Sequence, residues 1–258
     1  MHIALTIAGS DSGGGAGIQA DLKTFHRFGV FGTSAITAIT AQNTLGVADW
    51  VALDAAFVRN QIDQVVADLR PAAFKTGMLA TAPIASTIGD AIREFGLRPF
   101  VLDPVMVATS GDLLLDAPAI SAIRDGLVPS ADLVTPNLDE VAVLLGRRPC
   151  DEHEMRAAAE RIVNELGARA VLVKGGHLEG DEVIDVFYDG AATAFRRPRI
   201  ITPSTHGTGC TLSAAITARM ALGDALVDAV GAGLEFVHRA IQTAPGLGGG
   251  HGPLNHWA

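Results

Sequence analysis

Apolar, strand-like runs alternate with amphipathic, helix-like segments along almost the whole of this 258-residue chain. Ile3–Ala8 is a compact apolar run, and a glycine-rich loop connects it to the amphipathic stretch Gly17–Phe28. Asp54–Leu69 places apolar residues at helical spacing and is stopped by Pro71. Repeated strand–helix–strand units imply a parallel sheet that is covered on both faces. The alternation therefore predicts an α/β fold with a mostly parallel central sheet and helices on both faces.

The later segments continue this alternation, with one exception. Val183–Tyr188 and Thr193–Arg197 predict a β-hairpin closed by Asp189-Gly190, which would form a small antiparallel edge. Two helices, roughly Thr208–Leu222 and Asp224–Thr243, are expected at the end. The other expected strands are Ser34–Thr40, Ala73–Thr76, Phe100–Asp103, Asp132–Thr135 and Ala170–Lys174, and the other expected helices are Ile84–Phe95, Leu138–Leu145 and Glu152–Leu166.

Length and composition are those of a globular chain with one large core. Hydrophobic residues make up 48% of the sequence and charged residues 18%, and no low-complexity linker divides it. We therefore expect a single domain over residues 1–258. The glycine-rich tail from about residue 245 is expected to be loosely held.

Charge and cysteine content argue against several classes of partner. The net charge of −9 disfavours nucleic-acid binding, because affinity for phosphate backbones is built from clustered Lys and Arg. No apolar run approaches the roughly 18 residues that a membrane span needs, and Ile3–Ala8 lacks a basic leader. The two cysteines, Cys150 and Cys210, are too few for a disulfide framework or a zinc site. We expect a soluble, cytoplasmic protein that binds neither nucleic acid nor membranes.

The motifs of four large enzyme classes are absent. The P-loop pattern needs a Gly-Lys pair, and none occurs. The dinucleotide fingerprint fails at both glycine-rich turns, where Ile18 and Leu212 stand in place of the third glycine. Neither G-x-S-x-G nor H-E-x-x-H occurs. These absences weaken the case for a P-loop enzyme, a dehydrogenase, an α/β hydrolase or a zinc protease.

Two glycine-rich turns each begin an expected helix. Gly9–Gly17 contains five glycines in nine residues, more than one tight turn requires, which favours close approach of the backbone to a ligand over a mobile connection. At Gly207-Thr208-Gly209-Cys210, successive N–H groups at a helix start would form an anion hole. The same field lowers the pKa of a thiol, so Cys210 is a candidate base. The alternative is that Thr208 caps the helix and Cys210 packs in the core.

Polar side chains stand directly after three expected strands. Asp103, the pair Asn137 and Glu140, and Lys174 each have a plain structural explanation as a turn, a capping box and a solvated lysine. The carboxyl ends of parallel strands meet at one edge of a sheet, however, so these groups should lie together beside the anion hole. Oxygen ligands for hydrated Mg²⁺ and positive groups for phosphates are what phosphoryl transfer requires. The sequence therefore favours a kinase, with oxygen ligands for Mg²⁺ and positive groups for phosphates.

Gln42 follows the expected strand Ser34–Thr40. Its carboxamide offers a donor beside an acceptor, which matches the ring nitrogen and exocyclic amine of an aminopyrimidine. An ordinary loop glutamine is the alternative, and the residues alone favour it.

Ordered motifs over essentially the whole chain resemble those of hydroxymethylpyrimidine and phosphomethylpyrimidine kinases. The opening stretch Ala8–Thr24 resembles the signature of that family. The resemblance implies a ribokinase-like fold, a three-layer α/β/α sandwich. It also implies transfer of the γ-phosphoryl group of ATP to 4-amino-5-hydroxymethyl-2-methylpyrimidine, usually followed by a second transfer to the monophosphate. The further matching segments are Thr37–Thr44, Lys75–Leu79, Val101–Met106, Ser110-Gly111, Thr135–Glu140, Val173–His177, His206–Ser213 and Gly250–His256.

The resemblance assigns substrate-side roles to residues of this chain. Gln42 would bind the pyrimidine edge, and the segment Val107–Leu114, with Ser110-Gly111, would close over the substrates as a flap. In the wider fold the position of Cys210 is commonly an aspartate that acts as the base, so Cys210 is here a candidate base only. The residues that would line the pyrimidine pocket are Gly9, Asp21, Met78 and Val105.

Roles on the phosphate side follow in the same way. Gly207, Thr208 and Gly209 would hold developing negative charge, and Thr208 would also contact ATP. Asp103 and Glu140 would organise Mg²⁺, the latter through water. The resemblance further implies a homodimer. The other residues that would contact the nucleotide and its metal are Asn137 and Lys174.

Two alternative functions stay open from the sequence. Pyridoxal kinase has the same fold and chemistry, with Gln42 and Met78 favouring the pyrimidine. A non-catalytic nucleotide-binding protein is disfavoured because Asp103, Glu140 and Lys174 are all present.

Overall fold

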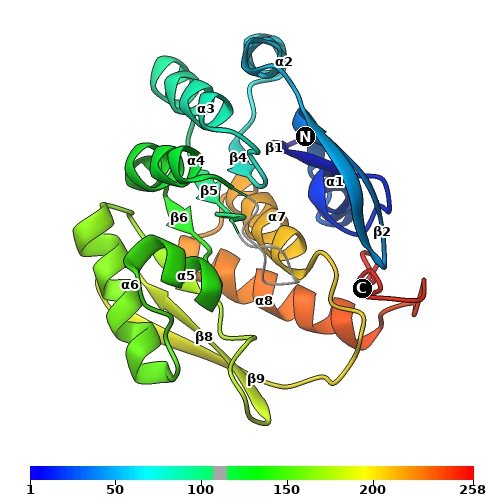
Figure 1. The fold of residues 1–258 in the computed structure, drawn as a ribbon, viewed down its shortest axis with the longest axis vertical. Helices are drawn as coiled ribbons and strands as arrows, with labels where there is room; N and C mark the ends of the chain where they lie inside the picture. Colours follow the sequence, from blue (N-terminus) through cyan, green and yellow to red (C-terminus); the bar gives the residue numbers. More distant parts are fainter. Residues whose placement is uncertain (107–114) are drawn as a thin grey trace.

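A computed structural model of the chain describes residues 1–106 and 115–258. The described residues form one nine-stranded sheet in the order β3-β2-β1-β4-β5-β6-β7-β8-β9, with helices on both faces (Figure 1). The strands are β1 (Ile3–Asp11), β2 (Phe31–Asn43), β3 (Gly46–Ala52), β4 (Ala73–Thr76), β5 (Phe100–Leu102), β6 (Leu133–Val134), β7 (Val171–Val173), β8 (Glu182–Tyr188) and β9 (Ala192–Pro198).

Six neighbouring strands, from β2 to β7, are parallel, as the alternation of segments predicts. The expected hairpin is present, since β8 pairs antiparallel with both β7 and β9. A second antiparallel edge, β3 against β2, is not among the strands expected from the sequence. Residues 46–51 are exposed throughout, so the segment lacks the alternation of buried and exposed side chains that marks a strand.

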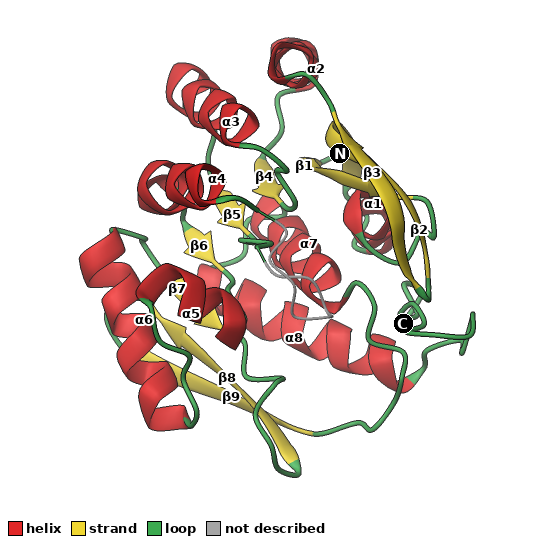
Figure 2. Ribbon diagram, in the orientation of Figure 1, coloured by secondary structure: helices red, strands yellow, loops and turns green. Residues whose placement is uncertain are grey.

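Helices cover both faces of the sheet, which confirms the three-layer α/β/α arrangement (Figure 2). One face packs against helices α2 to α6 through residues such as Ile84 and Leu138. The opposite face packs against α1, α7 and α8 through residues such as Phe25 and Ile216. The helices are α1 (Gly17–Arg27), α2 (Ala55–Leu69), α3 (Ala82–Phe95), α4 (Ala117–Ser121), α5 (Leu138–Leu145), α6 (Glu152–Leu166), α7 (Thr208–Ala221) and α8 (Leu226–Gln242).

Helix boundaries follow local signals in the sequence. Asp54 and Asp151 accept backbone N–H groups at the starts of α2 and α6, and Gly96 and Gly167 end α3 and α6 in the left-handed conformation. These signals explain why most helix ends lie within two residues of their expected positions. Of the helices in the described ranges, none combines the length and the apolar character needed to cross a membrane.

The C-terminal tail is anchored, so the expectation of a loosely held tail from about residue 245 is wrong. The His251 N–H donates to the carbonyl of Thr44 at 2.9 Å. Gly250 permits this approach, because a Cβ atom there would lie 2.2 Å from the Thr44 oxygen. His256 is buried against the hydroxyl of Thr211 at 3.2 Å, and burial lowers its pKa to about 4. Gly250 therefore serves close packing against Thr44, and His256 holds the end of the tail against α7.

Candidate active site

Polar residues that follow three adjacent strands meet at one edge of the sheet. Asp103 follows β5, Asn137 follows β6 and Lys174 follows β7. Asn137 and Lys174 form a parallel bridge, which continues the pairing of β6 and β7 beyond their ends. The prediction that these positions converge is confirmed, because parallel strands deliver their carboxyl ends to a common edge.

Asp103, Glu140 and Lys174 form a buried group that we call the charged cluster. Lys174 Nζ lies 3.2 Å from Asp103 Oδ1 and 3.9 Å from Glu140 Oε2. The two carboxylate side chains are only 2% and 4% exposed. Thr135 and Ser213 donate hydroxyl hydrogen bonds to Asp103 at 3.3 and 3.2 Å. The cluster is thus preformed, with each charge held by a partner.

The two carboxyl groups of the charged cluster differ in their acidity. Burial raises the pKa of Glu140 to about 7, and the neighbouring Asp103 adds to that effect, whereas Lys174 opposes it. Burial also acts to raise the pKa of Asp103, but Lys174 and Lys75 outweigh it and hold that pKa below its usual value. Asp103 is therefore an anion at neutral pH, whereas Glu140 titrates near neutrality.

Glu140 takes part in the cap at the start of α5. Its carboxylate accepts the N–H of Asn137 at 2.7 Å, while the Asn137 side chain accepts the N–H groups of Asp139 and Glu140 at 2.9 Å. This is the capping box that the spacing of Asn137 and Glu140 suggests. The capping role and a position beside Lys174 coexist, so the structural explanation does not exclude a functional one.

The start of α7 lies directly against the charged cluster. A Cβ atom at Gly209 would be 3.3 Å from Lys174 Nζ and 3.6 Å from Asp103 Oδ2. The N–H groups of a first helical turn have no acceptor within the helix. The Thr208 N–H reaches back to Thr205 O at 3.3 Å, so the N–H of Gly209 is the group best placed for an anion here. Thr208 does not cap the helix: Gly207 holds the cap position, and the Thr208 hydroxyl donates to Thr205 O at 2.6 Å.

Cys210 does not have the lowered pKa expected from its place at a helix start. Burial raises the pKa of the thiol to about 11, although the charge of Lys75 opposes the rise. Lys75 is fully buried and donates to Asp21 at 3.0 Å, and Thr6 donates to the same carboxylate at 2.6 Å. The expectation of a thiolate favoured by the helix is thus wrong, because enclosure by protein outweighs the helix field.

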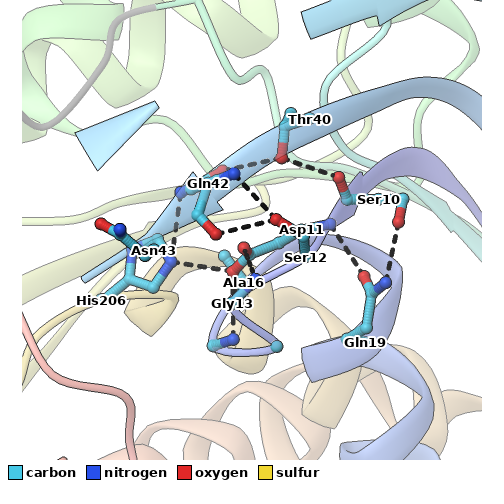
Figure 3. Close-up of polar contacts among 12 residues, drawn as sticks. Ser10, Asp11, Ser12, Gly13, Ala16, Gln19, Thr40, Gln42, Asn43 and His206 are labelled. Carbon is cyan, nitrogen blue, oxygen red and sulfur yellow. Dashed lines mark hydrogen bonds and ion pairs between the residues drawn. The ribbon is translucent and has the colours of Figure 1, made fainter. Parts of the chain in front are cut away.

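Gln42 belongs to a hydrogen-bonded group with Asp11, Thr40 and His206, which we call the Gln42 network (Figure 3). The Asp11 carboxylate accepts the N–H groups of Gly13, Gly15 and Ala16 at 2.7, 3.0 and 2.8 Å, so the glycine-rich loop is wrapped around it. His206 Nε2 lies 2.9 Å from Asp11 Oδ2 and 3.3 Å from Gln42 Nε2. The two glycine-rich turns therefore meet through this network.

Close approach between the two turns explains two of their glycines. A Cβ atom at Gly207 would lie 1.8 Å from the carbonyl oxygen of Gly15, and Gly207 has a φ of +81°. A Cβ atom at Gly15 would lie 2.6 Å from the His206 ring. An open hollow of about 510 Å³, bordered by Ser12 and Gln42, lies over the β2–β3 turn beside this contact.

The other residues expected around the pyrimidine are placed in different surroundings. Gly9 and Met78 are neighbours, since a Cβ atom at Gly9 would lie 3.6 Å from the Met78 sulfur. Val105 is partly exposed two residues beyond Asp103. Asp21 has no exposed surface, and its role as a pocket-lining residue stays a prediction. The expected flap Val107–Leu114 lies outside the described residues.

Lys75, His206 and Asp11 received no role from the residues alone. Lys75 lies inside β4, one residue before its end, so a search for polar residues directly after a strand misses it. Asp11 is the last residue of β1. His206 precedes the anion-hole turn, but its partner Asp11 is 195 residues away in the chain, and no local pattern carries that pairing.

The donor set restricts how a metal ion can be held. In the ranges 1–106 and 115–258, no group of three His, Cys, Asp or Glu side chains could ligate one. Asp103 and Glu140 offer two carboxylates beside a lysine. Mg²⁺ in nucleotide sites commonly uses one or two carboxylates and completes its shell with waters and phosphate oxygens, which these residues fit.

Comparison with known proteins identifies the family of the chain. The family model described as phosphomethylpyrimidine kinase matches residues 11–255. A hydroxymethylpyrimidine/phosphomethylpyrimidine kinase of Rhizobium meliloti is 54% identical over 99% of this chain and 97% of its own. A thiamine biosynthesis bifunctional protein of Geobacter sulfurreducens is 48% identical over 98% of this chain and 51% of its own. The ADP complex of Bacillus subtilis pyridoxal kinase is 40% identical, with a TM-score of 0.93, over 99% of this chain and 97% of its own.

Fold, charged cluster and comparisons together define a ribokinase-like small-molecule kinase. Within that class the assignment is narrower. The chain belongs to the phosphomethylpyrimidine kinase family.

Proposed function

We propose that the chain phosphorylates 4-amino-5-hydroxymethyl-2-methylpyrimidine with ATP, and then phosphorylates the monophosphate to the diphosphate, in thiamin biosynthesis. The observation that carries the proposal is the contact between the α7 start and the charged cluster, measured at Gly209. The full-length similarity to a kinase named for both pyrimidine substrates supports the choice of substrate. The ADP complex of the Bacillus subtilis relative supports the use of ATP.

On the phosphate side, positive groups neutralise the charge of the transferred phosphoryl group. Lys174 contacts phosphate oxygens, while the N–H groups of Gly207, Thr208 and Gly209 hold negative charge as it develops. Asp103 and Glu140 would hold Mg²⁺, which would neutralise part of the phosphate charge when bound. Asn137 fixes Glu140 through the capping box and orients its carboxylate.

On the substrate side, Gln42 binds the aminopyrimidine edge and directs the hydroxymethyl group towards α7. Gly9, Met78 and Val105 line the pocket. Asp21 stabilises the pocket indirectly, through its buried ion pair with Lys75. Cys210 stands at the helix start as a neutral thiol that already carries its hydrogen, so it does not act as the base that takes the hydroxymethyl proton.

Pyridoxal kinase is the second candidate, favoured by the similarity to the Bacillus subtilis enzyme. The test compares kcat/KM for the hydroxymethylpyrimidine and for pyridoxal under Mg-ATP, with mono- and diphosphate products followed over time. A ratio in favour of the pyrimidine, with both products formed, supports the proposal. Absence of both pyrimidine products would overturn it, and a ratio in favour of pyridoxal would establish the alternative.

We also propose that the protein is located in the cytoplasm and forms a homodimer. The contact surface between the two copies lies on β2 and β3. Ile39 and Val51 are register partners and are 51% and 63% exposed. A second copy that covers them would remove an apolar surface and an open strand edge from water. Sedimentation equilibrium should give twice the 26.7 kDa chain mass, and a monomer would refute this arrangement. The other exposed apolar side chains here are Phe31, Leu45, Val47 and Trp50.

A further inference from the structure

His206 stands between the anion-hole turn and the substrate side of the site. Its backbone N–H donates to Gly252 O at 3.1 Å, and it forms a parallel bridge with Pro253, so the anchored tail fixes its position. Its side chain is 17% exposed and reaches both Asp11 and Gln42 (Figure 3). The residue therefore touches the one side chain, Gln42, on which recognition of the pyrimidine edge depends.

The ionised state of Asp11 decides where His206 carries a hydrogen. Three backbone N–H groups point at the Asp11 carboxylate, and burial, which acts to raise its pKa, is outweighed by His206 and these N–H groups. An ionised carboxylate only accepts hydrogen bonds. Because Nε2 of His206 is 2.9 Å from Asp11 Oδ2, that nitrogen must bear a hydrogen, whether the ring is neutral or charged.

This hydrogen sets the orientation of the Gln42 carboxamide. The amide nitrogen also only donates, so an Nε2–H of His206 cannot share a hydrogen bond with Gln42 Nε2 at 3.3 Å. Half a turn about the Cγ–Cδ bond brings Oε1 to His206, where it shares the single Nε2–H with Asp11 Oδ2 in a three-centre hydrogen bond. The amide nitrogen then faces the Thr40 hydroxyl, at 3.2 Å, which gives its own hydrogen to Ser10 O at 3.0 Å. No two donors then face each other, and the second amide hydrogen of Gln42 is left for the substrate.

We propose that His206 is a positioning residue that holds the Gln42 carboxamide with its oxygen towards His206 and thereby sets the substrate preference. The inference rests on the proposed function. A carboxamide has two donors and two acceptor positions, and Thr40 and His206 take one of each. The remaining donor and acceptor are presented in a fixed order, which matches a ring nitrogen beside an exocyclic amine. A reversed carboxamide would set its donor against that amine.

A double-mutant cycle with Gln42→Ala and His206→Ala tests whether His206 acts through Gln42. We expect His206→Ala to raise KM for the hydroxymethylpyrimidine about tenfold, as for one lost hydrogen bond, with kcat changed by less than about threefold. In the Gln42→Ala background it should raise KM no further. His206→Gln, whose amide can donate at the same place, should recover most of the wild-type KM. His251 is an exposed histidine of the C-terminal tail, and His251→Ala should leave KM unchanged.

The cycle distinguishes a positioning role of His206 from a purely structural one. Equal effects of His206→Ala in both backgrounds, or no recovery in His206→Gln, would overturn the inference and leave a structural role. If His206→Ala does not fold, His206→Met, which fills space without a donor, takes its place against His206→Gln. A wild-type enzyme that does not phosphorylate the pyrimidine would overturn the proposed function together with this inference. An active wild type with an additive cycle would overturn only the inference.

Discussion

The charged cluster and the Gln42 network lie at the same side of the sheet but are built in opposite ways. In the charged cluster two carboxylates that are 2% and 4% exposed share one lysine, so its properties depend on burial and charge. In the Gln42 network a partly exposed carboxamide is held by the directions of hydrogen bonds, with the hydrogen bond from His206 to Asp11 at its base.

The difference follows from what each region has to do. Charge that develops during phosphoryl transfer is stabilised best by groups that are fixed and desolvated before the reaction. A substrate is distinguished from its analogues by the order of donors and acceptors that it meets. We therefore expect substitutions in the charged cluster to change kcat, and substitutions in the Gln42 network to change KM and the choice of substrate.

Asp103→Asn should have the largest effect, because it removes a buried negative charge while keeping the shape of the side chain. We expect kcat to fall on the order of 10²–10³-fold at saturating Mg-ATP, measured by coupled ADP release. Asp132→Asn is the matched control. Asp132 is equally buried, but it precedes β6 and bonds to Phe100 N and Arg98 at the opposite end of the strand. It should lower Tm with little loss of kcat. Similar kcat losses in the two variants would break the comparison.

Glu140→Gln should have the next largest effect, a change in the free energy of unfolding that depends on pH. The folded-state pKa of Glu140, about 7, lies above the ordinary 4.5. The unfolded chain therefore loses this proton first as pH rises, so Glu140 lowers the free energy of unfolding progressively between pH 4.5 and 7. Glu140→Gln should remove this loss and be more stable than wild type above pH 7, by at most about 3 kcal/mol.

Denaturant unfolding of both proteins at pH 5 and pH 8 measures that difference, and other titrating groups cancel in it. The same titration predicts that wild-type turnover at limiting Mg²⁺ rises with pH through about 7, since only the ionised carboxylate is a good metal ligand. Parallel stability profiles for wild type and Glu140→Gln would show that burial does not control this carboxyl group.

The charged cluster was largely predictable from the sequence, whereas the Gln42 network was not. Asp103, Asn137 and Lys174 each follow a strand, and one rule about parallel sheets places them together. That rule does not reach Lys75, which lies inside β4 rather than after it. The Gln42 network depends on a contact between residues 11 and 206, and neither hydropathy nor turn chemistry reports contacts across the whole chain.

The strand β3 and the anchored tail also differ from what the sequence predicts, because both depend on tertiary contacts. The strand β3 has residues 46–51 exposed, so its sequence lacks the periodicity from which strands are predicted. The glycines of the tail were interpreted as a sign of freedom, yet Gly250 is needed for close packing against Thr44. Glycine permits both outcomes, and only the surrounding tertiary structure decides between them.

Cys210→Ala should have the smallest effect, and it tests the residue that lies between the two regions. With a pKa of about 11, the thiol is neutral at pH 7, so it contributes neither a thiolate base nor a charge. We expect kcat to fall about tenfold or less, with the fold intact and the shape of the pH–rate profile unchanged between pH 6 and 9. Cys150→Ala, an exposed cysteine, is the matched control and should behave as wild type.

The alternative result is equally clear for Cys210. A base that works as a thiolate would make the wild-type rate rise tenfold per pH unit towards its pKa, and Cys210→Ala would remove that slope together with more than about a hundredfold of kcat. This outcome would mean that ligand binding brings positive charge close enough to reverse the effect of burial on the thiol. Cys210 would then belong functionally with the charged cluster. A small change would instead assign it to the packing beneath the anion hole, where Lys75 and Asp21 already balance each other.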